Sequence, residues 1–437
     1  MRRIYLIFLI SLIVLSCNNK ETITIDDGSE SFPVLSYDAE IFETLSLDKS
    51  EITITDTRDV LYWSKNFQNV KNNLGNIKTI SSLTDKKKIF SGSGKLKNIT
   101  SPIYFDERLC SIDSDGSIYC LDTKSNNLNF KIKIEQSNLN KIEIIRGGIA
   151  YFDDKLIYAD AYGQIKLFNA NSGEAIWSTQ IDFPVLSSPL IYRDYIYVIS
   201  SDNRIFAIDI NDGSISWSFQ TTAENKKNVK TSSPAAYENL IIVPFSNGEL
   251  IAFKYDDGRP IWSENVSKVS LVSNFDIKDI SANPVIYGSN IYTISTNGKL
   301  ISTNIINGQR NWSIEMSGSR TPIISGNIVL VIDKNSRLVC IDISTGEIYW
   351  IRQLNKYRKG NNAKDLNMWQ SPYLINNLIY NISYFGEVVI VSPKTGEVLA
   401  TENLGIKGIV SQPIVLQDRV YIADEKSNIF TLGLIML

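Results

Sequence analysis

The sequence predicts an all-β protein, an eight-bladed β-propeller of four-stranded antiparallel blades whose ring is closed by an N-terminal strand. A unit with 28 positions between a proline and a tryptophan recurs to the end of the 437-residue chain. Three short polar breaks divide the unit into four runs rich in Ile, Val, Tyr, Phe and Leu. Glycine or asparagine recurs at fixed turn positions. Repeats of four short strands are typical of propeller blades.

The clearest copy of the unit is Ser188–Trp217, which runs from Pro189 to Trp217. Three further copies keep both end residues: Pro234–Trp262, Pro284–Trp312 and Pro322–Trp350. Weaker copies of the same length are Pro102–Phe130, Ile149–Trp177 and Pro372–Ala400. An eighth copy begins at Pro413, but the chain ends before its tryptophan position. A unit that cannot bury a core alone must stack on its neighbours, so we expect one ring.

Within the clearest copy, the expected strands are Leu186–Tyr192, Tyr195–Ser200, Arg204–Asp209 and Ser214–Gln220. The breaks between them hold Asp, Asn, Arg and Gly, which suit tight hairpin turns. The tryptophan falls near the outer strand, and we expect its flat side chain to pack against the neighbouring blade. The glycines at the turn positions are therefore interpreted as structural.

Ring closure requires a fourth strand for the incomplete eighth copy, because an open blade would leave unpaired strand edges. The favoured candidate is Phe90, within Lys87–Ser91, because it lies 12 positions before Pro102, the same interval as Trp177 to Pro189. The alternative is Trp63, within Leu61–Phe67.

The N-terminus resembles a bacterial lipoprotein signal. Two arginines precede the apolar run Ile4–Leu15, and Val14-Leu15-Ser16-Cys17 resembles a lipobox. We expect cleavage after Ser16 and acyl chains on Cys17, which would attach the protein to a membrane without a spanning helix. The residue after the cysteine is asparagine rather than aspartate, which implies the outer membrane, facing the periplasm. The alternative is an ordinary secretory signal with an accidental cysteine.

Domain boundaries follow from this pattern. Residues 1–16 are expected to be the signal peptide, and residues 17–59 the lipid anchor and a flexible tether. The tether is polar and rich in Ser, Thr and acidic residues, which favours disorder. Residues 60–437 are expected to form the propeller.

Composition excludes several classes of function. The chain contains no histidine, which removes Ser-His-Asp and Cys-His catalysis and histidine-ligated metal sites. A net charge of −3 gives no reason to expect nucleic acid as a partner. No CxxC motif is present. Cys110 and Cys120 flank one hairpin turn and could form a disulfide in an exported protein, whereas Cys340 is expected to be a small buried residue.

The candidate binding surface is a set of long connections between blades. The interval from a tryptophan position to the next proline is 10 or 12 residues where the connection is short and 17 to 22 where it is long. The long connections should emerge on one face of the ring, where insertions commonly build binding sites. Their candidate partner-binding residues are Lys227, Lys230, Phe275, Asp276, Asp279 and Trp369. The alternative is tolerated loop variation, with Trp369 folded back on the ring.

The motif S-P-x(n)-G-x-L/I-x-A-x-D-x-x-T/D-G-x-x-x-W resembles the quinoprotein-type propeller repeat over about Ser101–Leu437. One family with this repeat is the quinoprotein alcohol dehydrogenases, which have a disulfide of adjacent cysteines and a calcium site. This chain has no Cys-Cys pair and is shorter. A lipobox, a tether and a bare ring instead resemble the BamB family of lipoproteins of the outer-membrane β-barrel assembly (BAM) complex.

The resemblance to BamB implies a scaffold with no catalytic, cofactor or metal site. It implies binding to the POTRA domains of BamA, membership of a complex with other BAM subunits, and contact with unfolded outer-membrane proteins by strand addition. The family's acidic pair before a blade falls on Asp279 and Ser281, and its basic loop residue falls near Lys230 or Lys227. The alternatives are a quinone-dependent oxidoreductase, or a propeller lipoprotein that binds another envelope partner or a glycan.

Overall fold

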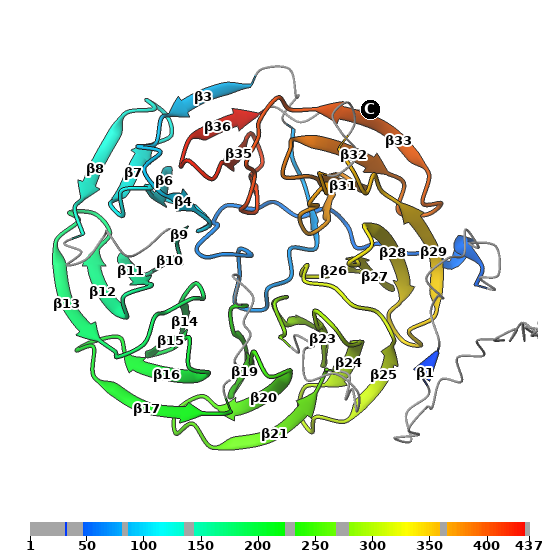
Figure 1. Cartoon of the computed structure of the whole chain (residues 1–437), viewed down its shortest axis with the longest axis horizontal. Coiled ribbons are helices and arrows are strands. Elements are labelled where there is room, and N and C mark those ends of the chain that lie inside the picture. Colours follow the sequence, from blue (N-terminus) through cyan, green and yellow to red (C-terminus); the bar gives the residue numbers. More distant parts are fainter. Residues whose placement is uncertain are drawn as a thin grey trace, which may run out of the picture.

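The computed structural model describes residues 31–32, 47–80, 86–134, 144–222, 232–267, 279–358 and 365–432. Eight four-stranded antiparallel sheets surround a common axis, as Figure 1 shows. The predicted eight-bladed propeller is therefore confirmed. No helix among the described residues is long and apolar enough to span a bilayer.

The blades follow one another in chain order, and the strands of each are named from the innermost to the outermost. Blade 1 comprises β5 (Ile103–Phe105), β6 (Arg108–Ile112), β7 (Ile118–Asp122) and β8 (Leu128–Ile132). Blade 2 comprises β10 (Gly147–Phe152), β11 (Lys155–Asp160), β12 (Gln164–Asn169) and β13 (Ala175–Gln180). Blade 3 comprises β14 (Leu190–Tyr192), β15 (Tyr195–Ile199), β16 (Arg204–Asp209) and β17 (Ile215–Gln220). Blade 4 comprises β18 (Ala235–Tyr237), β19 (Leu240–Pro244), β20 (Glu249–Lys254) and β21 (Pro260–Asn265).

The second half of the ring repeats this arrangement. Blade 5 comprises β22 (Val285–Tyr287), β23 (Asn290–Ile294), β24 (Leu300–Asn304) and β25 (Arg310–Ile314). Blade 6 comprises β26 (Ile323–Ser325), β27 (Ile328–Ile332), β28 (Arg337–Asp342) and β29 (Ile348–Gln353). Blade 7 comprises β30 (Tyr373–Ile375), β31 (Leu378–Ile382), β32 (Glu387–Val391) and β33 (Val398–Asn403). Blade 8 combines β34 (Ile414–Val415), β35 (Val420–Ala423) and β36 (Ile429–Leu432) with the N-terminal strand β3 (Lys87–Phe90).

Ring closure occurs at β3, as expected from the position of Phe90. This strand pairs antiparallel with β36, with Phe90 opposite Ile429. The Phe90 ring also stacks on Tyr119 of blade 1, with 3.7 Å between ring centroids. The outer strand of blade 8 therefore comes from the start of the chain and joins the last blade to the first.

The tryptophan position joins each blade to the next. Trp217, on the outer strand of blade 3, donates its indole N–H to the Tyr255 carbonyl of blade 4 at 3.0 Å. The same ring lies against Gly258, where an added Cβ would come within 2.4 Å of it. A small residue, Ala207, is the cross-strand neighbour of the indole and gives it room. Equivalent indole-to-carbonyl bonds occur at Trp177, Trp262, Trp312 and Trp350. The prediction that this tryptophan packs on the neighbouring blade is confirmed.

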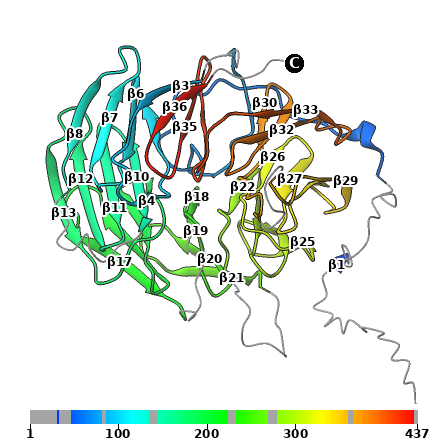
Figure 2. The ribbon, with the colours of Figure 1, turned by 45° about the horizontal axis from the view of Figure 1, so that its top comes forward.

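Residues 52–80, which we call the central segment, run along the inner strands of the ring. Backbone N–H groups of Tyr151, Ala236 and Ile286 donate to carbonyls of this segment at 2.8–2.9 Å. The short strand β2 (Asn76–Ile77) pairs in parallel with β30 of blade 7. Figures 1 and 2 show the blue chain crossing the interior of the ring, from the side of η1 (Lys49–Glu51) to the side of β3.

The central segment corrects two expectations. Trp63 does not close blade 8; it is fully buried and bridges to Tyr104 of blade 1. The expected flexible tether also reaches too far along the chain, because its last residues are bound to blade 6. The backbone N–H of Thr53 donates to the Asn327 side chain at 2.7 Å, and Ile52 is buried, so this part of the expected tether is ordered. Polar side chains that bond the backbone of another element fix a segment without regular secondary structure.

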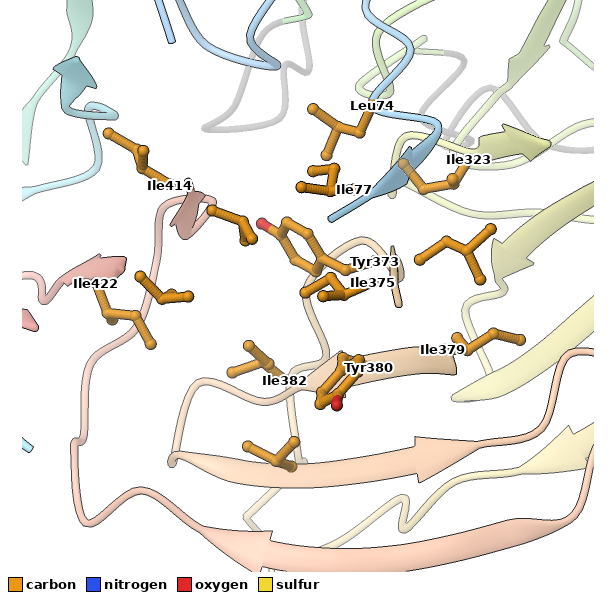
Figure 3. Packing of buried hydrophobic residues seen from close by; sticks show 14 of the residues in the cluster. Leu74, Ile77, Ile323, Tyr373, Ile375, Ile379, Tyr380, Ile382, Ile414 and Ile422 are labelled. Carbon is orange, nitrogen blue, oxygen red and sulfur yellow. The ribbon is translucent and has the colours of Figure 1, made fainter. Parts of the chain in front are cut away.

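The largest buried cluster joins this segment to blades 1, 6, 7 and 8. Leu74 and Ile77 lie beside Ile323, Tyr373 and Ile414, as Figure 3 shows. All five side chains are at most 1% exposed. Burial of apolar surface therefore holds the central segment in place in addition to its hydrogen bonds.

Besides the pairing of β2 with β30, two further short parallel pairings occur among the described residues. Strand β1 (Ser31–Phe32) pairs with β25 of blade 5, and β4 (Lys97–Asn98) pairs with β9 (Ile144–Ile145). The second pairing lies where the chain passes from blade 8 to blade 1 and from blade 1 to blade 2.

Candidate partner-binding face

The two faces of the ring differ in what the chain places on them. Strands alternate in direction within a blade, so the outer strand ends on the same side on which the next inner strand begins. The described ends of all connections between blades therefore lie on one side, which we call the loop face. The hairpin turns between the first and second strands lie on the opposite side, which we call the turn face. The central segment contacts such turns at Asn327 and Asn376 and so belongs to the turn face.

Most of the residues predicted to bind a partner, and the predicted lipidation site, lie outside the described residues. These are Cys17, Lys227, Lys230, Phe275 and Asp276. The two predicted partner-binding residues that the structure does describe are Asp279 and Trp369. Both belong to connections on the loop face, between blades 4 and 5 and between blades 6 and 7.

Asp279 is buried, so the expectation that it is exposed to a partner is wrong in this structure. Its side chain is 2% exposed and accepts a hydrogen bond from the Ser281 hydroxyl at 2.8 Å. Its carbonyl accepts from the backbone N–H of Thr296, in the turn between β23 and β24, at 2.9 Å. Asp279 therefore fixes the end of its connection against blade 5. The acidic pair implied by the family resemblance is represented here by two buried residues, because Ser281 is also only 3% exposed.

Trp369 is also buried, at 3% exposure, which agrees with the alternative that it folds back on the ring. Its indole N–H donates to the Asn355 carbonyl at 3.0 Å, and its backbone bridges to Ser383 of blade 7. The indole thus links the start and the end of the connection between blades 6 and 7. Its function here is to position the chain around it.

The described parts of this connection form a short hairpin on the loop face. Tyr357 and Leu366 form an antiparallel bridge, and the Arg358 N–H donates to the Asp365 carbonyl at 3.0 Å. The Asn367 N–H donates to the Lys356 carbonyl at 2.9 Å. We call residues 355–358 and 365–369 the blade 6–7 hairpin.

The blade 6–7 hairpin exposes the apolar residues that sequence reasoning missed. Tyr357, Leu366 and Met368 are 44%, 56% and 45% exposed. The available signal was the alternation of Leu366, Asn367, Met368 and Trp369, which places Leu366 and Met368 on one side of an extended chain and Trp369 on the other.

The centre of the ring contains a buried lysine. The Lys65 ammonium is 3% exposed and donates to the Asn66 carbonyl at 2.9 Å and to the Asn72 side-chain oxygen at 2.6 Å. Burial lowers the pKa of Lys65 to about 7. The Asn72 amide in turn donates to the carbonyls of Pro234 and Pro284, at 3.2 and 3.1 Å. This network ties the central segment to the start of blades 4 and 5.

Cys110 and Cys120 are directly opposite each other on β6 and β7, and their sulfur atoms form a disulfide in the structure. Cys340 is fully buried with a free thiol, and burial raises the pKa of that thiol. Within the described ranges, no cluster of three His, Cys, Asp or Glu side chains is placed to hold a metal ion.

The similarity to known proteins extends over the repeat region of the chain. The sequence profile of the family described as "Outer membrane protein assembly factor BamB" matches residues 114–352 and 316–434. The chain is 22% identical to the outer membrane protein assembly factor BamB of Shewanella oneidensis over 294 residues, covering 65% of this chain and 70% of that protein. It is 21% identical to the BamB of Yersinia pestis over 355 residues, covering 78% and 86%.

Solved structures with a similar fold include both families that share the repeat. The crystal structure of BamB from Moraxella catarrhalis superposes with a TM-score of 0.68 at 18% identity, covering 81% of this chain and 100% of that one. A europium-containing methanol dehydrogenase gives a TM-score of 0.66 at 14% identity, covering 83% and 89%. At these identities the superpositions establish the fold, whereas the profile match extends over most of the blades. The chain belongs to the family of outer membrane protein assembly factor BamB.

Proposed function

We propose that the protein is a non-catalytic scaffold of the outer-membrane β-barrel assembly complex, which binds BamA and aids the insertion of β-barrel proteins. The single observation that supports this proposal most is the family match, which spans blades 1 to 8. The placement of all inter-blade connections on one face provides a surface for such binding.

We propose that Cys17 carries the lipid and that the ring faces the periplasm from the outer membrane. The family's description as an outer membrane assembly factor agrees with an outer-membrane-associated location. Replacement of Cys17 by Ser tests the anchor: the protein should move from the membrane fraction to the soluble periplasmic fraction. Retention of the variant in the membrane fraction would contradict lipid anchoring.

Binding to BamA is tested with the purified chain, without its signal peptide, and the periplasmic POTRA domains of BamA from the same organism. We expect a complex by titration calorimetry, and we expect the triple variant Lys227→Glu, Lys230→Glu, Asp276→Lys to weaken it by about tenfold or more. Asp279 is left unchanged in this variant because it is buried and its replacement would disturb blade 5. The control is Lys394→Glu, an exposed lysine in the turn between β32 and β33, on the turn face.

The outcomes separate the proposals. No detectable complex with the wild-type chain would overturn the scaffold function. A complex that the triple variant leaves unchanged would keep the function but move the interface to other residues. Because the fold is shared with a methanol dehydrogenase, the same preparation should be assayed for alcohol-dependent dye reduction with added pyrroloquinoline quinone and calcium. Turnover in that assay would contradict a non-catalytic function.

A further inference from the structure

We propose that the blade 6–7 hairpin and the adjoining tip of blade 7 form a docking surface for an acidic protein segment that also carries apolar side chains. We call this the hairpin surface. It consists of Lys356, Tyr357, Arg358, Leu366, Met368, Phe385 and Lys407.

Hydrogen bonds attach the inward side of the hairpin to the ring. Besides the Trp369 bond, the amide groups of Asn355 and Asn367 both donate to the Glu387 carboxylate, the latter at 2.7 Å. Asn367 and Trp369 are each 3% exposed, so the inward side of the hairpin is fixed to blade 7. A surface that is already ordered loses little conformational entropy when a partner binds.

The outward side is apolar. Tyr357, Leu366 and Met368 are each close to half exposed, although they belong to a segment that is otherwise anchored. Other exposed apolar residues on the outer strands, such as Ile176, Ile215 and Ile261, lie on different blades, and only Val398 and Leu399 share a described strand. Single exposed apolar residues are normal, whereas a group of them on one ordered element indicates a binding site.

Three cations flank these apolar side chains. The Arg358 guanidinium lies 5.0 Å from the centroid of the Phe385 ring, and the Lys407 ammonium lies 5.8 Å from it. The Lys356 ammonium lies 5.9 Å from the Tyr357 ring. Within the described part of the chain, none of the three cations forms an ion pair. They are therefore available to an incoming carboxylate, and the aromatic rings hold them in place.

Carboxylates around the hairpin surface are mostly engaged by other groups. Glu387 receives both amides of the hairpin, and Glu425 pairs with Lys97 at 2.9 Å and accepts from the Tyr384 hydroxyl at 2.7 Å. Asp365 is the exception and is exposed. The local charge is thus positive, and charge complementarity selects an acidic partner.

A protein segment fits these groups better than a membrane surface does. Arginine beside aromatic and methionine side chains is the composition of protein interfaces, where carboxylates bind the cations and apolar residues cover the rings. The surface combines the hairpin with the turn between β31 and β32 and with the connection between blades 7 and 8. The proposal does not depend on membership of the assembly complex, because it concerns a different inter-blade connection from the residues implied by the family resemblance.

The experiment uses the full chain without its signal peptide and two fluorescent capped peptides. One alternates Glu and Asp with Phe and Leu, and the other has Lys in place of every acidic residue. We expect fluorescence anisotropy to show binding of the acidic peptide only. The triple variant Lys356→Glu, Arg358→Glu, Lys407→Glu should weaken it by about tenfold or more. The variant Tyr357→Ser, Leu366→Ser, Met368→Ser should weaken it by about fivefold.

The matched control is Lys49→Glu, Lys78→Glu, Lys394→Glu, which changes the net charge equally at exposed lysines away from the loop face. It should bind the acidic peptide like the wild type. Thermal unfolding of all variants checks that they fold. We expect them to fold because the replaced side chains lie at the surface.

Three results would overturn the proposal. Equal binding of the acidic and basic peptides would show that charge does not select the partner. Equal weakening by the control variant would show a general charge effect. Sedimentation with phosphatidylglycerol-containing vesicles but not with phosphatidylcholine vesicles, lost in the hairpin variant and without peptide binding, would identify an anionic membrane surface as the occupant.

Discussion

The turn face and the loop face of the ring are built in opposite ways from the same repeat. On the turn face, short hairpin turns meet the central segment, whose Trp63, Phe67 and Leu74 are at most 1% exposed. On the loop face, the connections between blades vary in length, and one of them presents Tyr357 and Leu366 to solvent. The same strands therefore support one face that serves stability and another that is available for binding.

The difference shows how a propeller separates these two tasks. A hairpin turn within a blade must keep its length because it sets the register of two strands. A connection between blades carries no such constraint and can lengthen at little entropic cost. The central segment occupies the constrained side, so it adds contacts among the blades without covering the variable connections.

The largest expected effect tests the stabilising function of the turn face. Trp63→Ala removes a fully buried indole that belongs to the cluster of the central segment and blades 1, 6, 7 and 8. We expect a loss of about 3–5 kcal/mol in the free energy of unfolding. Urea denaturation followed by tryptophan fluorescence or circular dichroism measures it. A loss below about 1 kcal/mol would mean that the central segment contributes little to the fold.

A second test separates packing from backbone strain at two turn-face glycines. Gly258 and Gly288 have similar φ values, +68° and +59°, but an added Cβ meets the Trp217 ring at 2.4 Å in the first and nothing within 4 Å in the second. We expect Gly288→Ala to cost about 1 kcal/mol from the left-handed backbone alone. Gly258→Ala should cost about 1–3 kcal/mol more, because the indole must move. Equal costs would contradict the inter-blade function of the tryptophan.

A third test concerns the buried lysine of the central segment. Burial lowers the pKa of Lys65 from 10.5 to about 7, so the unfolded chain binds more protons between these pH values. Stability relative to Lys65→Met should therefore rise with pH from about 7 towards 10, by on the order of 1 kcal/mol per pH unit, and should be flat below about pH 7. Parallel denaturation of both proteins at each pH cancels the other titrating groups. A difference that does not change with pH would mean that Lys65 keeps an ordinary pKa.

The smallest effect is expected on the loop face. Met368→Ala changes a side chain that is 45% exposed and has no described hydrogen bond. We expect a change within about 0.5 kcal/mol in the free energy of unfolding. A loss comparable to that of Trp63→Ala would remove the distinction between the two faces.

The fold could be predicted because every copy of the repeat shows the same spacing of strands and turns. Blade number, strand breaks, the contact of each tryptophan with the next blade, and closure at Phe90 all follow from fixed spacing. Closure could be separated from the Trp63 alternative because the 12-residue interval before Pro102 matches that before Pro189. Each of these features depends on position in a unit, and the units confirm one another.

The central segment could not be predicted because it has no counterpart in the repeat. Its apolar residues Trp63, Phe67, Val70, Leu74 and Ile77 follow spacings of 4, 3, 4 and 3, which are typical of a helix. The chain instead takes positive φ at Phe67, Gln68, Asn72 and Gly75 and forms irregular turns. Asparagine side chains that bond the backbone compete with a helix, and here the inner strands supply the remaining partners.

Trp369 and Asp279 show a second limit. Both are predicted at a binding surface because they belong to long connections between blades, and both are buried. In an irregular loop, the residue type does not predict the direction of a side chain, because no strand or helix periodicity determines that direction. In the connection between blades 6 and 7, the exposed apolar residues are neighbours of the tryptophan, and partner binding by this connection stays a prediction.

The position of the central segment in the chain has a consequence for the order of folding. This segment is synthesised before any blade, yet its partners include Asn327, Asn376 and Gln417, separated from it by 274 to 338 residues. Closure of such distant contacts is entropically costly and slow. The buried cluster that contains Trp63 and Phe67 is therefore incomplete until the last blade has been synthesised, and the nascent chain is most prone to aggregation during that interval.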